Sequence, residues 1–163
     1  MSLRISQTVL GSLMVALGLM AAACSRGKEG TGSPSSDPEL AKRGSIEVTA
    51  RLVEVPEDSI FDRKLYDYAN VLKYEVLEVH RGKVKGQTIY VGQYNPAKPR
   101  SEAASQRVPG IGGDLKSFRA GQVHRMALEG PMLPKFTGGV LNKYSEEDTD
   151  PIYFAVWTNL VSG

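Results

Sequence analysis

Three side chains of the kinds that carry nucleophilic or metal chemistry stand out because they are so few. Cys24 is the only cysteine in 163 residues, and His80 and His124 are the only two histidines. A lone cysteine fits a nucleophile, a metal ligand, a buried apolar side chain or an attachment point. A zinc site needs three or four protein ligands, and two histidines 44 positions apart without a His-x-Glu motif do not supply them. The sequence therefore predicts no metal site and no cofactor.

The residues around Cys24 indicate an attachment point. Arg4 is the only charge before it, the run that follows is apolar, and alanines at 21–23 directly precede the cysteine. A basic start, an apolar stretch and small residues at a cleavage site are typical of a secretory signal. With the cysteine they resemble the bacterial lipobox, which implies that 1–23 is removed and that Cys24 is lipidated. The alternatives are an ordinary signal-peptidase site, which releases a soluble chain with a free thiol, and an uncleaved membrane anchor.

The segment 24–44 is rich in Ser, Gly, Pro and charges of both signs, with Leu40 as its only large apolar side chain. This composition buries too little surface to offset the loss of chain entropy, so we expect the lipidated cysteine to be followed by a flexible linker. More than one lipid chain gives stable anchoring. We expect the protein at the cell membrane or the outer membrane, facing the periplasm or the exterior.

The remaining residues, 45–163, are enough for one domain with a single core. They contain no cysteine, 15 Lys plus Arg and 15 Asp plus Glu, which excludes disulfides and leaves the domain neutral. A neutral domain with interspersed signs has neither the electrostatic footprint of a nucleic-acid binder nor a basic patch for anionic lipids. We expect no nucleic-acid partner.

Alternation with a period of two runs through most of this domain and predicts an all-β fold. In the first strand the apolar phase changes after Leu52, which indicates a bend or bulge. Long loops are expected at 95–121, with room for a short helix near 101–107, and at 130–151. A bent first strand and a long connection after the third fit a small five-stranded OB-like barrel. The predicted strands cover residues 45–55, 70–80, 87–94, 122–129 and 152–161.

The stretch YANVLKYEVLEVHRGKVKGQTIYVGQY at 68–94 contains an alternating strand, a basic turn bounded by glycines and a returning strand. It resembles the second and third strands of OB-fold modules of the netrin and tissue-inhibitor-of-metalloproteinase type. The resemblance implies the fold. A protease-inhibitor-like module is an alternative function that rests on this analogy alone.

No catalytic arrangement emerges from the motifs. There is no Gly-x-Ser-x-Gly elbow, GIGGD at 110–114 is not followed by Lys-Ser or Lys-Thr, and SEEDTD at 145–150 lacks the spacing of a calcium loop. His124 is in phase with the apolar residues of its strand, which predicts a hydrogen-bonded histidine at the core. The enzymatic alternative is a hydrolase of envelope polymers that recruits His124, Asp114 and a loop serine.

The segment YVGQYNPAKPR at 90–100 is the best candidate for ligand recognition. Tyr90 and Tyr94 fall on one face of a strand, with Gly92 leaving a gap between them. An aromatic platform beside amides and cations suits sugar rings, and OB-fold barrels bind oligosaccharides. The alternative is that Tyr90 is a core residue and Tyr94 closes the barrel end, as Trp157 is expected to pack in its strand. The predicted binding residues are Tyr94, Asn95, Lys98 and Arg100.

These observations favour a lipid-anchored envelope protein that carries a non-enzymatic binding or assembly module. The expected partners are the membrane, through the lipid on Cys24, and either an envelope polysaccharide or another envelope protein.

Overall fold

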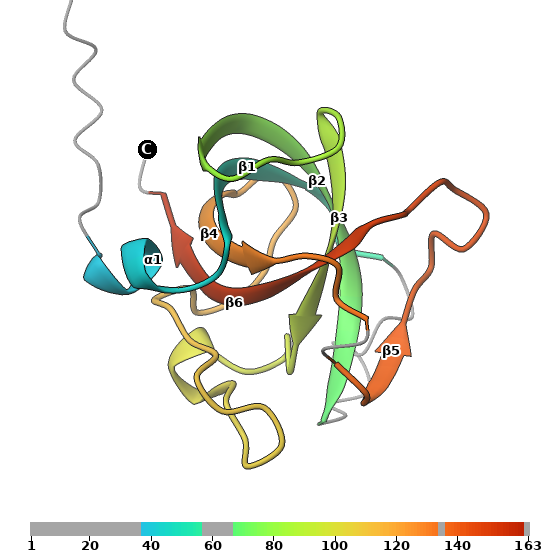
Figure 1. Ribbon diagram of the computed structural model, residues 1–163. Coiled ribbons are helices and arrows are strands. Elements are labelled where there is room, and N and C mark those ends of the chain that lie inside the picture. Colours follow the sequence, from blue (N-terminus) through green and yellow to red (C-terminus); the bar gives the residue numbers. More distant parts are fainter. Residues whose placement is uncertain (1–36, 57–66, 134–135, 162–163) are drawn as a thin grey trace, which may run out of the picture. The chain divides into compact units, whose positions relative to one another are not determined.

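The computed structural model describes residues 37–56, 67–133 and 136–161, and strands dominate this part of the chain (Figure 1). The five predicted strands are confirmed, with bounds that differ by one or two residues. A short 3-10 helix lies where the first long loop was expected to hold a helix. The elements are α1 (Pro38–Lys42), β1 (Ile46–Glu54), β2 (Tyr68–Arg81), β3 (Thr88–Tyr94), η1 (Arg100–Glu102), β4 (Val123–Glu129), β5 (Gly139–Leu141) and β6 (Ile152–Leu160).

Five of the strands close into the predicted OB-like barrel. Their order is β1–β4–β6–β3–β2, and pairing of β2 with β1 completes the circuit. Within the barrel β3 and β6 run parallel and the other neighbours are antiparallel. The barrel therefore combines a β2–β3 hairpin with a long crossover that brings β6 beside β3, as OB-like topology requires.

The length of β2 makes this closure possible. Its first half, from Ala69 to Glu75, pairs with β3, whereas the stretch from Lys73 to Arg81 pairs with β1. Three register shifts interrupt the β1–β2 ladder, and one of them falls between Leu52 and Glu54. Bulges of this kind bend and twist the strand that carries them. The bend predicted from the change of apolar phase in the first strand is confirmed.

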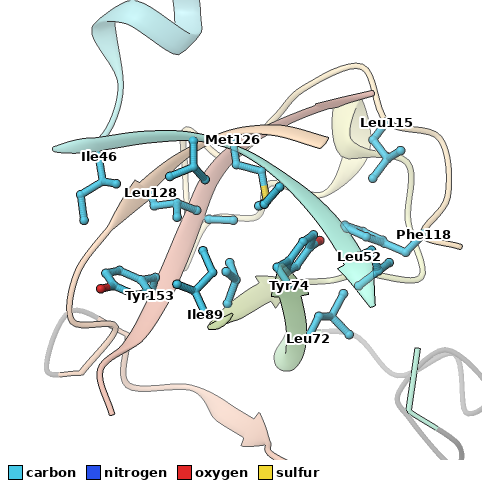
Figure 2. Close-up of a cluster of buried hydrophobic side chains, with 14 residues drawn as sticks. Ile46, Leu52, Leu72, Tyr74, Ile89, Leu115, Phe118, Met126, Leu128 and Tyr153 are labelled. Carbon is cyan, nitrogen blue, oxygen red and sulfur yellow. The ribbon is translucent and has the colours of Figure 1, made fainter. Parts of the chain in front are cut away.

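One face of each barrel strand fills the interior (Figure 2). Val48, Leu72 and Val91 are fully buried there and represent three of the five strands. Leu115 and Phe118 come from the connection between η1 and β4 and lie together at one side of the cluster. The interior is thus closed by a loop as well as by the strands.

A second apolar layer covers the outer wall formed by β2, β3 and β6. Tyr94 and Phe154 point away from the barrel interior and pack against Ile111 of the first long loop and Phe136 of the second. A Cβ atom at Gly92 would lie 2.4 Å from the Met132 sulfur, so Met132 fills the gap that the glycine leaves on this face. Both long loops therefore lie against the barrel wall.

The strand β5 lies inside the segment 130–151, which the sequence predicted to be a loop. It pairs in parallel with the first residues of β2, from Tyr68 to Asn70. Three residues that include a glycine are too few to show a period of two. The pairing is set by the packing of the surrounding loop on the barrel wall.

The flexible linker predicted over 24–44 is wrong for its last part. Residues 38–42 form α1, and its N-cap Asp37 accepts a hydrogen bond from the Glu39 amide. Leu40, the single large apolar residue of the segment, is 1% exposed. The folded part therefore begins no later than Asp37. Residues 24–36 of the predicted segment, with Cys24 among them, and the signal at 1–23 lie outside the described residues.

Because α1 buries little apolar area, polar contacts hold it against β6. The Asp37 carboxylate accepts hydrogen bonds from Trp157 Nε1 (2.8 Å) and Asn159 Nδ2 (2.7 Å) of β6. The Arg43 guanidinium lies 4.7 Å from the centre of the Trp157 ring. Trp157 packs as expected, and it packs against the segment that was predicted to be free.

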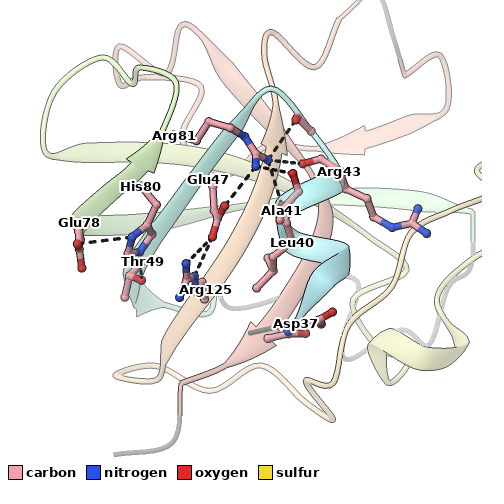
Figure 3. Close-up of polar contacts among 12 residues, drawn as sticks. Asp37, Leu40, Ala41, Arg43, Glu47, Thr49, Glu78, His80, Arg81 and Arg125 are labelled. Atoms are coloured by element: carbon pink, nitrogen blue, oxygen red, sulfur yellow. Dashed lines mark hydrogen bonds and ion pairs between the residues drawn. The ribbon is translucent and has the colours of Figure 1, made fainter. Parts of the chain in front are cut away.

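Arg81 and Glu47 join α1 to the seam between β1 and its two neighbours (Figure 3). The Arg81 guanidinium donates to the carbonyls of Leu40 (3.0 Å), Ala41 (2.7 Å), Arg43 (2.6 Å) and Gly44 (3.3 Å). The buried Glu47 carboxylate lies 3.4 Å from Arg81 Nη1 and 2.7 Å from Arg125 Nη2. Two cations offset the desolvation of this carboxylate, and the three residues connect β1, β2 and β4.

Replacement of Leu40 by alanine is expected to release α1 while the barrel stays folded. Loss of a buried leucine costs about 2–3 kcal/mol, which exceeds what a five-residue helix retains without its apolar contact. Hydrogen exchange should therefore accelerate at the amides of Leu40 and Arg43 and remain slow in β4. Lys42→Ala, on the exposed side of the same helix, is the control. Unchanged exchange in Leu40→Ala would show that the polar contacts alone hold the segment.

Candidate ligand-binding site

The four residues predicted to bind a ligand lie close together, but three of them are buried. Tyr94, Asn95 and Arg100 are each 1% exposed, and Lys98 is half-buried. The Arg100 guanidinium donates to the carbonyls of Tyr94 (2.8 Å), Asn95 (2.5 Å) and Lys98 (3.2 Å). This arginine thus ties down the turn that follows β3, and it faces carbonyl oxygens rather than solvent.

Burial lowers the pKa of Arg100 to about 10, and the side chain remains a cation at neutral pH. Carbonyl dipoles and the face of the Phe118 ring, 5.1 Å away, surround the charge. The aromatic platform expected from Tyr90 and Tyr94 is covered as well. Tyr90 packs against Tyr144 at 5.3 Å and donates to the Glu147 carboxylate.

A pocket of about 500 Å³ opens where the two long loops meet over β3 and β6. Phe136 and Phe154 form an apolar side of it, with their rings stacked at 5.4 Å. Tyr94 meets Phe136 edge to face at 5.6 Å. The lining residues are Asp67, Tyr94, Arg107, Val108, Pro109, Phe136, Thr137, Gly138 and Phe154.

A chain of hydrogen bonds fixes the polar wall of this pocket. The Tyr94 hydroxyl donates to Asp67 Oδ1 (2.5 Å), which leaves it to accept from the Ser105 hydroxyl (2.8 Å). Ser105 Oγ in turn accepts from the backbone amides of Arg107 (3.2 Å) and Val108 (3.3 Å). The phenol therefore links Asp67, which directly precedes β2, to the first long loop, and holds this wall of the pocket in place.

Asp67 and Asn95 support the same wall with backbone conformations that most side chains avoid. Their φ angles are +66° and +45°, and the Asp67 amide donates to Asn95 Oδ1 (2.6 Å). The Nδ2 of the same side chain donates to the Ala103 carbonyl (2.9 Å). Aspartate and asparagine tolerate the left-handed region better than other non-glycine residues. Such conformations often occur at binding sites, where the surrounding structure holds them.

Opposite charges flank the pocket. Burial and the Asp67 carboxylate raise the pKa of the Tyr94 phenol, and the Arg107 guanidinium acts in the opposite direction. Both charges are therefore within electrostatic reach of the same hydroxyl group. The pocket combines aromatic faces, a carboxylate and a cation, which is the mixture that small polar ligands with an apolar face require.

The pocket joins Tyr94 from the predicted set with residues that the sequence did not single out. Asp67 directly precedes β2, Arg107 lies in the first loop and Phe136 in the second. No spacing or motif connects these three positions. The sequence placed Arg107 and Phe136 in its two predicted long loops, 95–121 and 130–151, and gave no signal for Asp67.

His124 is a core residue, as its strand phase predicted. It is fully buried, with Nδ1 3.1 Å from the Tyr74 hydroxyl and Nε2 3.2 Å from Gln122 Oε1. Gln122 Oε1 can only accept, so Nε2 carries the proton and Nδ1 accepts from Tyr74. Asp114 instead accepts from the Leu160 amide (2.7 Å). His124 and Asp114, which the hydrolase alternative would use together, are therefore not hydrogen-bonded to each other.

His80 lies in a row of polar groups on the surface of β1 and β2. Its Nε2 is 2.8 Å from Thr49 Oγ1, and its Nδ1 is 3.5 Å from Glu78 Oε1. The order is that of nucleophile, base and acid, but the Glu78 side chain is 68% exposed and too distant to orient the ring by a hydrogen bond. We interpret the row as a surface contact.

Within residues 37–56, 67–133 and 136–161, no three potential metal ligands among His, Cys, Asp and Glu gather at one place. None of the helices in this part of the chain has the length and apolar character to span a bilayer.

Comparisons of the chain with known protein families, with curated proteins and with solved structures found no significant match. The pocket is therefore interpreted from its own geometry.

The buried His124 is expected to make stability depend on pH. Burial lowers its pKa from 6.5 to about 4, so between these values the unfolded chain binds a proton that the folded chain does not. Stability that is complete above pH 6.5 should therefore fall as the pH drops towards 4, by about 3 kcal/mol at most.

Urea unfolding at pH 7 and pH 4.5 measures this effect in the wild type and in His124→Gln. The variant should lose less stability on acidification than the wild type, whatever its stability at pH 7. His80→Gln, at the surface, should keep the wild-type difference. Equal acid losses in the wild type and His124→Gln would contradict the assignment.

Proposed function

We propose that the chain is an envelope lipoprotein whose OB-like barrel serves as a non-enzymatic module that binds an envelope polysaccharide through the pocket between its two long loops. The observation that carries the proposal is the pocket itself, in which Phe136, Phe154 and Tyr94 stand beside Asp67 and Arg107. Sugar rings present apolar faces and peripheral hydroxyl groups, and this lining is complementary to both.

The position of the pocket supports a binding role. OB-fold barrels take ligands on the face of strands 2 and 3 and the adjoining loops. In this chain the second long loop lies on that face, with Met132 against Gly92 and β5 beside β2. The pocket lies at the border of the covered area, where Tyr94 ends β3 and both loops contribute side chains.

The envelope part of the proposal rests on the sequence. The apolar segment before Cys24 and the small residues at 21–23 resemble a lipoprotein signal. A lipid on Cys24 and the residues up to Asp37 would tether the barrel to a membrane. The ligand would then be a polymer of the same envelope.

Titration with purified envelope polysaccharides should raise the thermal midpoint of the full chain in detergent micelles. Ligand at about 100 times its Kd adds about 2.7 kcal/mol to the stability, which corresponds to roughly 5–10 °C for a chain of this size. Thr137→Trp, which places a large side chain at the pocket rim, should abolish the shift. Ser117→Trp, on an exposed site elsewhere, is the control. A panel without any shift would direct the search to a protein partner.

Cys24→Ser is expected to block lipidation and to leave an unprocessed precursor. The reason is that Cys24 is the only thiol in the chain, so no other side chain can take the lipid on sulfur. Metabolic labelling with a fatty acid and the electrophoretic mobility of the chain report both effects. Ser25→Ala is the neighbouring control. Lipid incorporation into Cys24→Ser would refute the lipoprotein assignment.

A further inference from the structure

We propose that the pocket selects a sugar unit that carries a carboxylate, such as a hexuronic acid, and that Arg107 pairs with this carboxylate while Asp67 accepts a hydrogen bond from a ring hydroxyl. The inference rests on the proposed function, because it names the chemistry of the ligand that the same pocket takes.

The two charged side chains of the pocket do not form an ion pair with each other. Asp67 and Arg107 both line it, and within the described residues no ion pair joins their side chains. Asp67 accepts a hydrogen bond from the Tyr94 hydroxyl, and the Arg107 charge acts on the same hydroxyl by lowering its pKa. A ligand with an anionic group and a hydroxyl group can therefore contact both.

Asp67 retains acceptor capacity. Its Oδ1 accepts from Tyr94, and in the described part of the chain no hydrogen bond reaches its Oδ2. The backbone of Asp67 is held by Asn95, so the carboxylate is fixed before a ligand arrives. A fixed acceptor loses little conformational entropy when it binds a hydroxyl group.

Arg107 is an exposed cation on a restrained turn. Its backbone amide is held by Ser105 Oγ, 3.2 Å away, and the same oxygen also binds the amide of Val108. A guanidinium pairs with a carboxylate through two parallel hydrogen bonds, which is stronger and more directional than a contact with a neutral hydroxyl. A neutral sugar would leave this cation without its best partner.

The apolar side of the pocket and its volume limit the size of the ligand. Phe136 and Phe154 are 4% and 7% exposed, so only a small part of each ring is accessible to a ligand. Val108 and Pro109 stand with them in the lining. A single sugar ring fits a pocket of about 500 Å³, which lies within the range of about 300–1,000 Å³ for small-molecule sites.

The test compares trigalacturonic acid with its fully methyl-esterified form, in which the carboxylate is masked and the ring hydroxyls are kept. Binding to the full chain in detergent micelles is measured by calorimetry, next to a panel of neutral envelope glycans. We expect the acid to bind at least about 10-fold more tightly than the ester. Arg107→Gln should abolish this preference, and Arg119→Gln, an exposed arginine later in the same connection, should keep it.

Asp67→Asn gives a second readout. Asparagine tolerates the left-handed backbone and keeps an oxygen for the Tyr94 hydroxyl, but it lacks the charge that accepts strongly from a sugar hydroxyl. It should weaken the acid and the ester by similar factors. The thermal midpoint of each variant, measured without ligand, shows that it is folded.

The outcomes separate the two levels of the proposal. Equal binding of acid and ester, an Arg107→Gln variant with an unchanged preference, or binding of neutral glycans alone would overturn the carboxylate inference and leave the glycan-binding function standing. Binding of no glycan at all would overturn both. Preference for the acid that only Arg107→Gln removes would support the inference.

Discussion

Closure of the barrel between β1 and β2 is the constraint on which the rest of the structure depends. A strand that pairs with β3 over its first half and with β1 over its second half leaves no free edge along the ladder. The three register shifts in the β1–β2 ladder supply the bend that this closure needs. The Glu47 carboxylate of β1 forms ion pairs with Arg81 of β2 and Arg125 of β4, and so connects β1 to both of its neighbours. Once the sheet is closed, its interior has room for only one set of side chains.

The outer wall follows from that limitation. β2, β3 and β6 carry apolar residues on both faces, so closure leaves Tyr94, Phe154 and their neighbours outside the barrel. These side chains need a cover, and the two long loops provide it. The pocket lies where these two loops meet and leave a space between them. The pocket thus forms because the apolar residues outside the closed barrel are covered by two separate loops.

Buried polar groups determine which parts of this layer are rigid. Arg100 donates to three backbone carbonyls at the end of β3 and in the turn after it, and these dipoles and an aromatic face surround its charge. His124 remains neutral at pH 7 because burial lowers its pKa to about 4, and its two ring nitrogens bond to a hydroxyl and a side-chain amide. The first of these groups fixes Tyr94 and Asn95, and through them Asp67. The pocket wall is therefore held by Arg100, a buried side chain that is not part of the pocket lining.

The sequence by itself determined the all-β fold, the five barrel strands and the core position of His124, because a period of two and its phase are properties of neighbouring residues. It also located the two long loops between the third and fourth and the fourth and fifth predicted strands. It could not decide that Arg100 and Asn95 are internal supports, since a charged residue in a loop looks the same whether it faces solvent or carbonyls. Nor could it place α1, because the hydrogen bonds that hold this helix come from distant strands: from Trp157 and Asn159 to Asp37, and from Arg81 to the Leu40 carbonyl. The pocket joins the start of β2 with residues from two loops, and only tertiary packing brings such distant segments together.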